Sequence, residues 1–390
     1  MRNARRVGRP PALTAHPRGT VLILAIGVTI VLTGLVLVFC RQMRVEALAS
    51  SNLLESIQAD AIVNGAAQYV ANRLASNQDR SLLDSEIESE AVPLGDGFFW
   101  ILRPSPDDER QYGFGVVDES SKLNLNTADL DTLLRLPNMT AELASAILDW
   151  RDPDAAYADG GGADNEYYLL QPEPYYCKSA PFETLDELLL VRGATRELLY
   201  GLDANRNEVV DDEEARQQGL LTDFNGQMTC GLCKYLTVYS VEPNPTGRGP
   251  LVRGRINVNT APREVLRCLP GLTDGDIDLL IAKRSVGGPD LSNSSWVMNT
   301  LPRATAQQIA VRITTRSYQF SADIVGVGGN GRGFKRVKYV FDLLSGSPRV
   351  LYCRDLTHLG WPLSTGLRDA LRSGEPVPLS SANAFTLGRR

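Results

Sequence analysis

The chain has 390 residues but only two histidines, His16 and His358. A Ser-His-Asp catalytic set needs a histidine beside its nucleophile, and histidine-containing zinc sites need it as a ligand. Because His16 lies within the first twenty residues, His358 is the only histidine left for the body of the chain. The sequence therefore indicates a structural protein and not an enzyme.

Cysteine is also scarce, with six residues in the whole chain. Cys230 and Cys233 are spaced as in zinc and redox motifs. A zinc ion would need two further ligands, and a redox motif would need a strand-to-helix setting that this segment lacks. Disulfides outside the cytoplasm are the expected use, with Cys177, Cys230 and Cys233 as candidates. The sequence leaves the pairing open.

Charged residues are absent from residues 20–39. A helix of about 20 residues is about 30 Å long, which is enough to cross the hydrocarbon core of a bilayer. Five arginines and no acidic residue precede this run, so the N-terminus should stay in the cytoplasm and the bulk of the chain should lie outside. The segment predicts either a signal sequence or a single membrane span.

The apolar run continues directly into an amphipathic stretch. One apolar face recurs at helical spacing and comprises Val45, Leu48, Ala49, Leu53, Ile57 and Ala61. A cleaved secretory signal usually has a shorter apolar region and a small-residue cleavage site. We therefore predict one continuous helix over residues 20–77, with its first half in lipid and its second half packed on a soluble domain.

The balance of charge argues against nucleic acid as a partner. The net charge is −6, and removing the five arginines before Thr20 lowers it by five, to −11. A domain this acidic is a poor general binder of phosphate backbones. No nucleic acid is expected, and cations or basic partners suit the chain better.

Short strands are predicted at residues 98–102, 112–117, 318–324, 337–343 and 349–353. In the third of these, apolar and polar residues alternate, which predicts a half-buried strand. Strands at both ends of the chain suit an α/β domain into which the middle of the chain is inserted.

The middle of the chain contains an internal repeat. Lys-Leu-Asn-Leu-Asn-Thr-Ala at residues 122–128 is echoed by Arg-Ile-Asn-Val-Asn-Thr-Ala at 255–261, and the match extends to Arg151 and Arg284. We call residues 122–151 the first copy and residues 255–284 the second copy. Thr127 and Thr260 are expected to cap a first helix, and a second helix should begin near Thr140 or Thr273.

Each copy is similar to a helix-hairpin-helix unit, a motif that often binds DNA. In DNA-binding versions, two glycines at the hairpin let backbone N–H groups approach a phosphate. The first copy has Leu-Pro-Asn-Met-Thr there, and the second has Leu-Pro-Gly-Leu-Thr. The second glycine is missing from both copies, so the hairpins are expected to be structural.

The sharpest chemical signal lies at residues 203–214, which have the spacing of an EF-hand calcium loop. The expected calcium ligands are the side chains or, for valine, the main-chain carbonyl of Asp203, Asn205, Asn207, Val209, Asp211 and Glu214. Position six of the loop, normally glycine, is Glu208, where a positive φ costs about 1 kcal/mol. A weaker candidate for a second ion, without recognised spacing, comprises Asp159, Asp164, Asn165 and Glu166. The alternative for residues 203–214 is an acidic surface loop before a helix, and for the weaker candidate a flexible loop is the preferred interpretation.

The N-terminal layout resembles the type IV pilin and pseudopilin family, in which a basic leader ending in glycine precedes an apolar helix. In that family a prepilin peptidase cuts after the glycine, which here falls between Gly19 and Thr20. The family usually has phenylalanine first and glutamate fifth in the mature chain. This chain has Thr20 and Leu24 at those positions.

The order of motifs between residues 122 and 261 resembles the K-type minor pseudopilins of the type II (general) secretion pathway. Asn-Leu-Asn-Thr-Ala, Leu-Pro, Trp-Arg-Asp, Ala-Pro-Phe-Glu-Thr-Leu-Asp-Glu-Leu and Asn-Val-Asn-Thr-Ala follow one another. K-type proteins also typically lack the fifth-position glutamate, in agreement with Leu24. The resemblance also implies calcium in the helical domain, because K-type pseudopilins as a family are associated with calcium there.

The resemblance implies an α+β fold, in which a pilin-like long N-terminal helix packs on an antiparallel sheet that carries a large inserted helical domain. It implies a structural subunit at the tip of the periplasmic pseudopilus, single-pass in the inner membrane with its bulk in the periplasm. The implied partners are the I-type and J-type minor pseudopilins, the major pseudopilin and the prepilin peptidase. A membrane-anchored DNA receptor of competence type, also built from one span and helix-hairpin-helix units, is the alternative.

The expected organisation follows from these features. The segments are a leader (1–19), the N-terminal helix (20–77), the first part of the α/β domain (78–123 and 236–260), the inserted helical domain with the calcium loop (124–235), the second repeat (261–315), the C-terminal strands (316–371) and a flexible tail (372–390).

Overall fold

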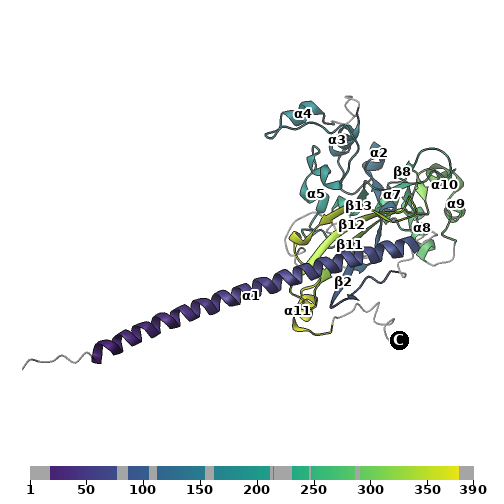
Figure 1. The fold of residues 1–390 in the computed structure, drawn as a ribbon. Helices are drawn as coiled ribbons and strands as arrows, with labels where there is room; N and C mark the ends of the chain where they lie inside the picture. The colour runs from purple at the N-terminus through teal and green to yellow at the C-terminus, as the bar shows by residue number, and fades with distance from the viewer. Residues whose placement is uncertain are drawn as a thin grey trace, which may run out of the picture. The chain divides into compact units, whose positions relative to one another are not determined.

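A helix of 59 residues, α1 (Arg18–Ser76), begins the described part of the computed structural model (Figure 1). The structure describes residues 18–76, 87–104, 112–153, 162–210, 214, 231–245, 247–285 and 290–376. The chain divides into two units, Met1–Leu54 and Glu55–Arg390. The prediction of one continuous helix over residues 20–77 is confirmed to within two residues at either end.

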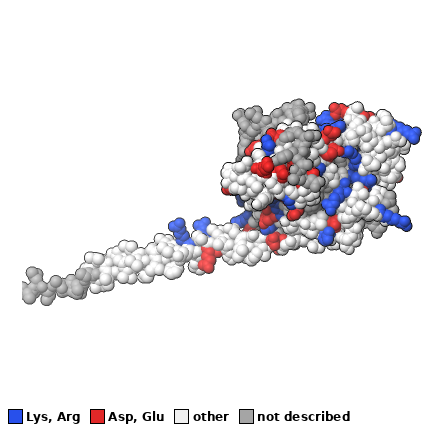
Figure 2. All heavy atoms as spheres, turned by 90° about the horizontal axis from the view of Figure 1, so that it is seen from above, with Lys and Arg blue, Asp and Glu red and all other residues white. Residues whose placement is uncertain are grey.

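The first unit contains the apolar half of α1. This half is long and apolar enough to cross a membrane, and its aliphatic side chains are exposed. Figure 2 shows the stretch as a white surface without blue or red atoms. Because an exposed apolar surface of this length is unfavourable in water, it is suited to lipid or to neighbouring helices.

The second unit is built on a seven-stranded antiparallel sheet. Its central path runs β1-β2-β11-β12-β13, with β3 paired to β2 and β4 paired to β11. The strands are β1 (Val92–Leu94), β2 (Gly97–Pro104), β3 (Tyr112–Phe114), β4 (Val117–Asp118), β11 (Gln319–Val327), β12 (Phe334–Asp342) and β13 (Arg349–Asp355). The five strand segments predicted from sequence all lie in this sheet, and β2 and β4 from the N-terminal part of the chain pair with β11 from its C-terminal part.

The C-terminal half of α1 packs on one face of this sheet. Ile62, Val63 and Val70 form a buried core with alternate residues of β2 and β11. Gly326 is required where the helix and the sheet approach, because a Cβ there would lie 2.8 Å from Val63 Cγ2. Glu55, also on α1, is buried and accepts a hydrogen bond of 2.9 Å from the N–H of Gly333 in the β11–β12 turn.

The opposite face of the sheet is covered by α11 (Thr365–Ser373). Leu367 and Leu371 of this helix pack against Trp100, Val325 and Val327. Strand β11 is therefore buried on both faces along its whole length, and the prediction of a half-buried strand is wrong. The alternation misled because the polar residues of β11 are buried too, Gln319 in a hydrogen bond with Asp342 and Asp323 in an ion pair with Arg336.

A second core belongs to the helices. It is built by residues from Leu123 to Ile313 and includes Leu236, Val238, Ile256 and Val258. The helices are α2 (Leu130–Leu133), α3 (Ala141–Arg151), α4 (Asn165–Leu169), α5 (Arg196–Tyr200), α7 (Arg263–Arg267), α8 (Asp274–Ser285), α9 (Ser295–Thr300) and α10 (Arg303–Ile309).

Residues 236–260 differ from the expected organisation, which placed them in the α/β domain. Among the described residues they form β6 (Leu236–Thr237), β7 (Val241–Glu242), β8 (Val252–Arg253) and β9 (Ile256–Asn257). These strands pair in two-stranded sheets apart from the seven-stranded one. Leu236, Val238, Ile256 and Val258 of this segment lie in the helical core, so the segment belongs structurally with the helices.

The two copies of the repeat have the same internal structure. A strand of each copy makes a short parallel pair, β5 (Leu123–Asn124) with β6 and β9 with β10 (Ile313–Thr314). The asparagine that ends each strand accepts a hydrogen bond from the N–H two residues on, at 2.9 Å for Asn124 and 3.0 Å for Asn257. The matching arginines each donate to two carbonyls of the turn, Arg151 to Leu125 and Ala128, and Arg284 to Val258 and Ala261.

The helix caps within the copies differ in part from the prediction. Thr127 and Thr260 do not cap the first helices, whose N-caps are Asp129 and Pro262. The threonines instead lie inside the asparagine turn, so each helix begins two residues later than expected. The second helices begin where predicted, next to Thr140 and Thr273.

Candidate metal centre

The loop with EF-hand spacing follows α5 in the helical part of the fold. That helix ends at Gly201, whose φ of 63° turns the chain toward Asp203. Val209 and Val210, later in the loop, are 0% and 2% exposed. The two valines anchor the loop in the interior, as the spacing of an EF-hand loop predicts for its eighth position.

The polar side chains of the loop turn inward and organise its backbone. Asp203 is buried, and its carboxylate accepts hydrogen bonds from the N–H groups of Asn207 at 3.0 Å and Glu208 at 2.8 Å. Asn205 Oδ1 also accepts from the N–H of Asn207, at 3.0 Å. Asn207 Oδ1 accepts from the N–H of Val209 at 2.9 Å. The loop is therefore held in a tight turn by its own oxygen donors.

The first and last residues of the loop are brought together. Glu214 Oε1 accepts hydrogen bonds from the N–H groups of Ala204 at 2.9 Å and Asn205 at 3.1 Å. Burial, followed by the nearby carboxylate of Glu214, raises the pKa of Asp203 to about 8. Two carboxylates close together in a buried site favour a cation between them or a proton on one of them.

Position six has the conformation that the loop requires. Glu208 has a φ of 62°, in the left-handed region that glycine usually occupies. Its side chain is buried and forms ion pairs with Lys338 at 2.7 Å and Lys122 at 3.4 Å. Burial raises the pKa of Glu208, but Lys122 and Lys338 lower it more, to about 2.

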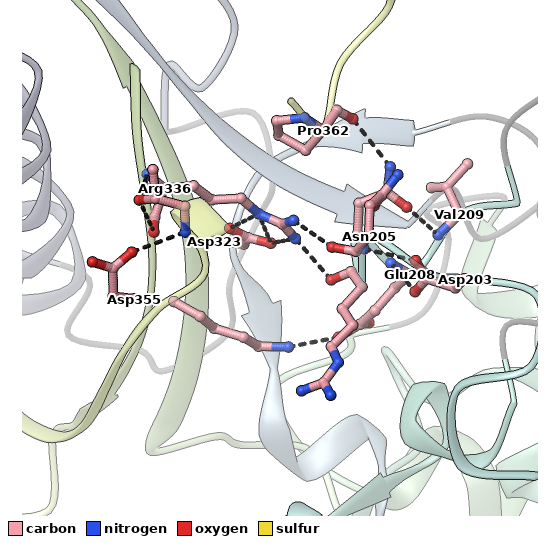
Figure 3. Close-up of polar contacts among 12 residues, drawn as sticks. Asp203, Asn205, Glu208, Val209, Asp323, Arg336, Asp355 and Pro362 are labelled. Carbon is pink, nitrogen blue, oxygen red and sulfur yellow. Dashed lines mark hydrogen bonds and ion pairs between the residues drawn. The ribbon is translucent and has the colours of Figure 1, made fainter. Parts of the chain in front are cut away.

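Arg336 on β12 completes the contacts of the loop with the sheet, as Figure 3 shows. The arginine is fully buried and donates to the carbonyls of Asn205 at 2.5 Å and Arg206 at 2.7 Å. Asp323 on β11 accepts from the same guanidinium, at 2.5 to 3.1 Å. Asn207 Nδ2 also donates to the carbonyl of Pro362, at 3.0 Å. These contacts join segments that are far apart in sequence.

Sequence reasoning missed Glu208, Arg336 and Lys338 as residues of this site. It treated Glu208 only as a strained replacement for glycine. A signal was nevertheless present in the sequence, because a large acidic residue at a position that strains it indicates that its side chain has a use. The identity of the partners could not be read, since they lie 86 and 130 residues away.

The remaining predicted site residues are placed as follows. Asp211 and Cys230 lie outside the described residues, as does Asp159 of the weaker acidic candidate. Asp164 of that candidate accepts from the N–H of Asn165 and begins α4, which is a structural role. Over the described ranges, no three His, Cys, Asp or Glu side chains form a metal-binding group. A ligand set that uses asparagine, a main-chain carbonyl or Asp211 is a different kind of group and remains compatible with this finding.

The structure describes some of the candidate disulfide residues and part of the cleavage site. Cys177 is a buried free thiol, with Sγ 3.8 Å from the carbonyl oxygen of Asp149. Burial raises the pKa of Cys233 to about 12. Because Cys230 lies outside the described residues, the use of these cysteines in disulfides stays a prediction. Gly19 lies in the first turn of α1 and is exposed, whereas the side chain of Thr20 is not among those described.

Residues 116–203 match the family model of type II secretion system (T2SS), protein K. The matched range covers the first copy of the repeat and ends at the first residue of the loop. No curated protein sequence matches the chain. Among solved structures, the chain is similar to one in the crystal structure of the GspK-GspI-GspJ complex from enterotoxigenic Escherichia coli. The TM-score is 0.44 and the identity 12%, over 80% of this chain and 99% of that chain.

Proposed function

We propose that this chain, whose residues 116–203 match the family model of type II secretion system protein K, belongs to that family and acts as a minor pseudopilin in protein export. The family match is the observation that carries the proposal. The fold supports it, because a long N-terminal helix packs on an antiparallel sheet and a helical part is inserted between the sheet strands. The role is structural, since proteins of this family are assembly subunits and not enzymes.

The apolar half of α1 serves as the membrane anchor before assembly. The positively charged leader keeps the N-terminus in the cytoplasm, and the second unit lies in the periplasm. A prepilin peptidase removes the leader after Gly19. Mass spectrometry of the protein from its native membrane tests this, because processing predicts a mature chain that begins at Thr20, with or without a methyl group. An intact Met1 would contradict it.

The subunit stands at the tip of the pseudopilus, with the I-type and J-type minor pseudopilins and the major pseudopilin as partners. Leu24 supports the tip position. At this place other pseudopilins carry a glutamate thought to neutralise the N-terminal ammonium of a neighbouring subunit, and a tip subunit has no neighbour above it. Co-purification of the full chain with each candidate partner tests the assembly. Association with the major pseudopilin alone, without either minor one, would contradict the tip position.

The DNA receptor is not favoured. Thr140 and Thr273 accept hydrogen bonds from the backbone N–H groups of Leu143 and Asp276, and so cap helices α3 and α8 where DNA-binding units have their second glycine. Filter binding of duplex DNA at low salt separates the two functions. Tight binding with a steep salt dependence would favour the receptor.

The loop at residues 203–214 holds a calcium ion, with the ligands expected from its spacing. The donors fit this ion because they are all oxygens, and hard cations such as calcium prefer carboxylate, amide and carbonyl oxygen. Burial and, after it, the nearby Glu214 carboxylate raise the pKa of Asp203, and a bound cation would compensate the charges of both carboxylates. When bound, the ion supplies a fixed positive charge that holds the loop closed.

Calcium binding is tested by calorimetry and by melting of the full chain in detergent, with calcium and with a chelator. We expect calcium to raise the melting temperature of the wild type. Asp203→Asn should abolish that rise, whereas Glu197→Gln, at an exposed carboxylate of α5, should keep it. An unchanged melting temperature in wild type, together with no heat of binding, would remove the calcium site.

A further inference from the structure

Glu208 has a function that a glycine at the same position could not have. A glycine would satisfy the positive φ without strain, whereas Glu208 adopts it at a cost. The side chain then reaches two ammonium groups, Lys338 Nζ at 2.7 Å and Lys122 Nζ at 3.4 Å. The sixth position of the loop is thus a point of attachment.

Strand β12 supplies a second attachment two residues before Lys338. Arg336 and Lys338 lie on the same face of the strand, because side chains alternate along it. Arg336 donates to the carbonyls of Asn205 and Arg206, and Lys338 donates to the carboxylate of Glu208. One strand therefore holds the third, fourth and sixth positions of the loop.

Arg336 is itself fixed from the neighbouring strand. Asp323 of β11 accepts two hydrogen bonds of 3.0 and 3.1 Å from its Nε and a third of 2.5 Å from Nη2. Residues Asp323 and Lys338 are also partners in the β11–β12 register. The loop is attached to the centre of the sheet and not to a free edge.

We propose that Arg336, Glu208 and Lys338 form a clamp between the calcium loop and the seven-stranded sheet. Because of this clamp, the loop and the sheet unfold locally as one cooperative unit. The proposal rests on the calcium site proposed above. The ion needs the backbone geometry of residues 203–209, and the clamp fixes the same backbone onto β12. By linkage, an ion that stabilises the closed loop then stabilises the sheet as well.

The experiment is hydrogen exchange of the full chain in detergent, with and without calcium, followed by mass spectrometry of peptides. At free calcium about 100 times the dissociation constant, opening of the loop is suppressed about 100-fold. With the clamp intact, β12 peptides should show a suppression of similar size. In Lys338→Met, the loop should remain protected by calcium, while calcium-dependent protection of β12 falls by about tenfold or more.

Lys335→Met is the matched control, since Lys335 also lies on β12 and forms a 2.7 Å ion pair, with Asp355 instead of the loop. It should keep the calcium-dependent protection of β12. Lys338→Arg should keep it too, because a cation remains at the clamp. If Lys338→Met behaved as Lys335→Met, the clamp would be wrong.

Glu208→Gly supplies an independent test, and Glu208→Gln replaces it if the glycine variant does not fold. The clamp predicts that either variant uncouples β12 from calcium, as Lys338→Met does. A glycine variant that binds calcium more tightly and still protects β12 would overturn the proposal, because position six would then need only a positive φ. If wild type binds no calcium in calorimetry, both the site and the clamp fall; if it binds calcium without protecting β12, only the clamp falls.

Discussion

Arg336→Met is expected to destabilise the second unit strongly, and far more than the exchange of a partly exposed arginine on the neighbouring strand. Arg336 is fully buried and satisfies one carboxylate and two main-chain carbonyls at once. Methionine fills much of the same volume and leaves packing largely intact. The variant therefore isolates the loss of charge and of hydrogen bonds.

The size of the destabilisation follows from the buried groups that lose their partner when Arg336 is replaced. Asp323, which is 7% exposed, loses its cationic partner, and the carbonyls of Asn205 and Arg206 lose their donor. Breaking a buried ion pair from one side costs about 3–5 kcal/mol. The lost carbonyl hydrogen bonds act on the same network and are not added in full. We expect about 4 kcal/mol, or a fall in melting temperature of roughly 6 °C for a unit of this size.

The assay is thermal and urea unfolding of the full chain in detergent, followed by circular dichroism. Arg354→Met is the matched control, because Arg354 lies on neighbouring β13 and pairs with Asp186 at a partly exposed site. It should cost about 1 kcal/mol or less. Adding Asp323→Leu to Arg336→Met should recover part of the loss, since no uncompensated charge then remains buried. Equal costs for Arg336→Met and Arg354→Met would refute this reasoning.

Three further outcomes are expected. Burial raises the pKa of Asp355, but hydrogen bonds from Lys335 and Thr357 lower it more, to about 2, below the model-peptide value of 3.8. The ionised carboxylate of Asp355 therefore stabilises the fold fully above about pH 4, and this stabilisation is lost toward pH 2. In urea unfolding, Asp355→Asn should lower the free energy of unfolding by up to about 1 kcal/mol above pH 4, because the pair is exposed, and the difference from wild type should vanish toward pH 2. Burial raises the pKa of the Cys268 thiol to about 12, whereas Cys353 is exposed. Maleimide at pH 7.5 should label Cys353 in the native chain and Cys268 only in urea, as mass spectrometry would show. Arg284→Met removes donors at 3.0 and 2.7 Å from two carbonyls and should lower the free energy of unfolding by about 2 kcal/mol in urea titration.

The sequence predicted those parts of the fold that depend on local patterns. Helix α1 was predictable because its apolar and amphipathic spacing continues without a break. The second helices of the repeat were predictable because Thr140 and Thr273 precede helical patterns. The sequence also predicted that position six of the loop turns with a positive φ, which Glu208 has.

The parts that failed depend on contacts between distant segments. Thr127 and Thr260 looked like N-caps, but the asparagine turns before them delay the helices. Strand β11 looked half exposed because the burial of Asp323 depends on Arg336, which lies on another strand. Polar residues in a strand predict solvent only when no partner meets them, and the partner is set by the topology of the whole sheet.

The two copies of the repeat have the same internal hydrogen bonds but contact different parts of the fold. Each uses an asparagine turn closed by an arginine on two carbonyls, which explains why Arg151 and Arg284 match although the hairpin glycine does not. At the hairpin itself, Asn138 and Gly271 share a positive φ, so only the backbone conformation had to be kept.

Asn124 and Asn257, which end the first strand of each copy, donate hydrogen bonds to different partners beyond the copies. Asn124 Nδ2 donates to the carbonyl of Ser240, within the helical part, at 3.1 Å. Asn257 Nδ2 donates to Asp118 of β4 at 2.9 Å, and Thr260 and Ser317 donate to the same carboxylate. The second copy is thus tied directly to a strand of the sheet, whereas the first copy contacts the loop that Arg336 holds, through the ion pair of Lys122 with Glu208.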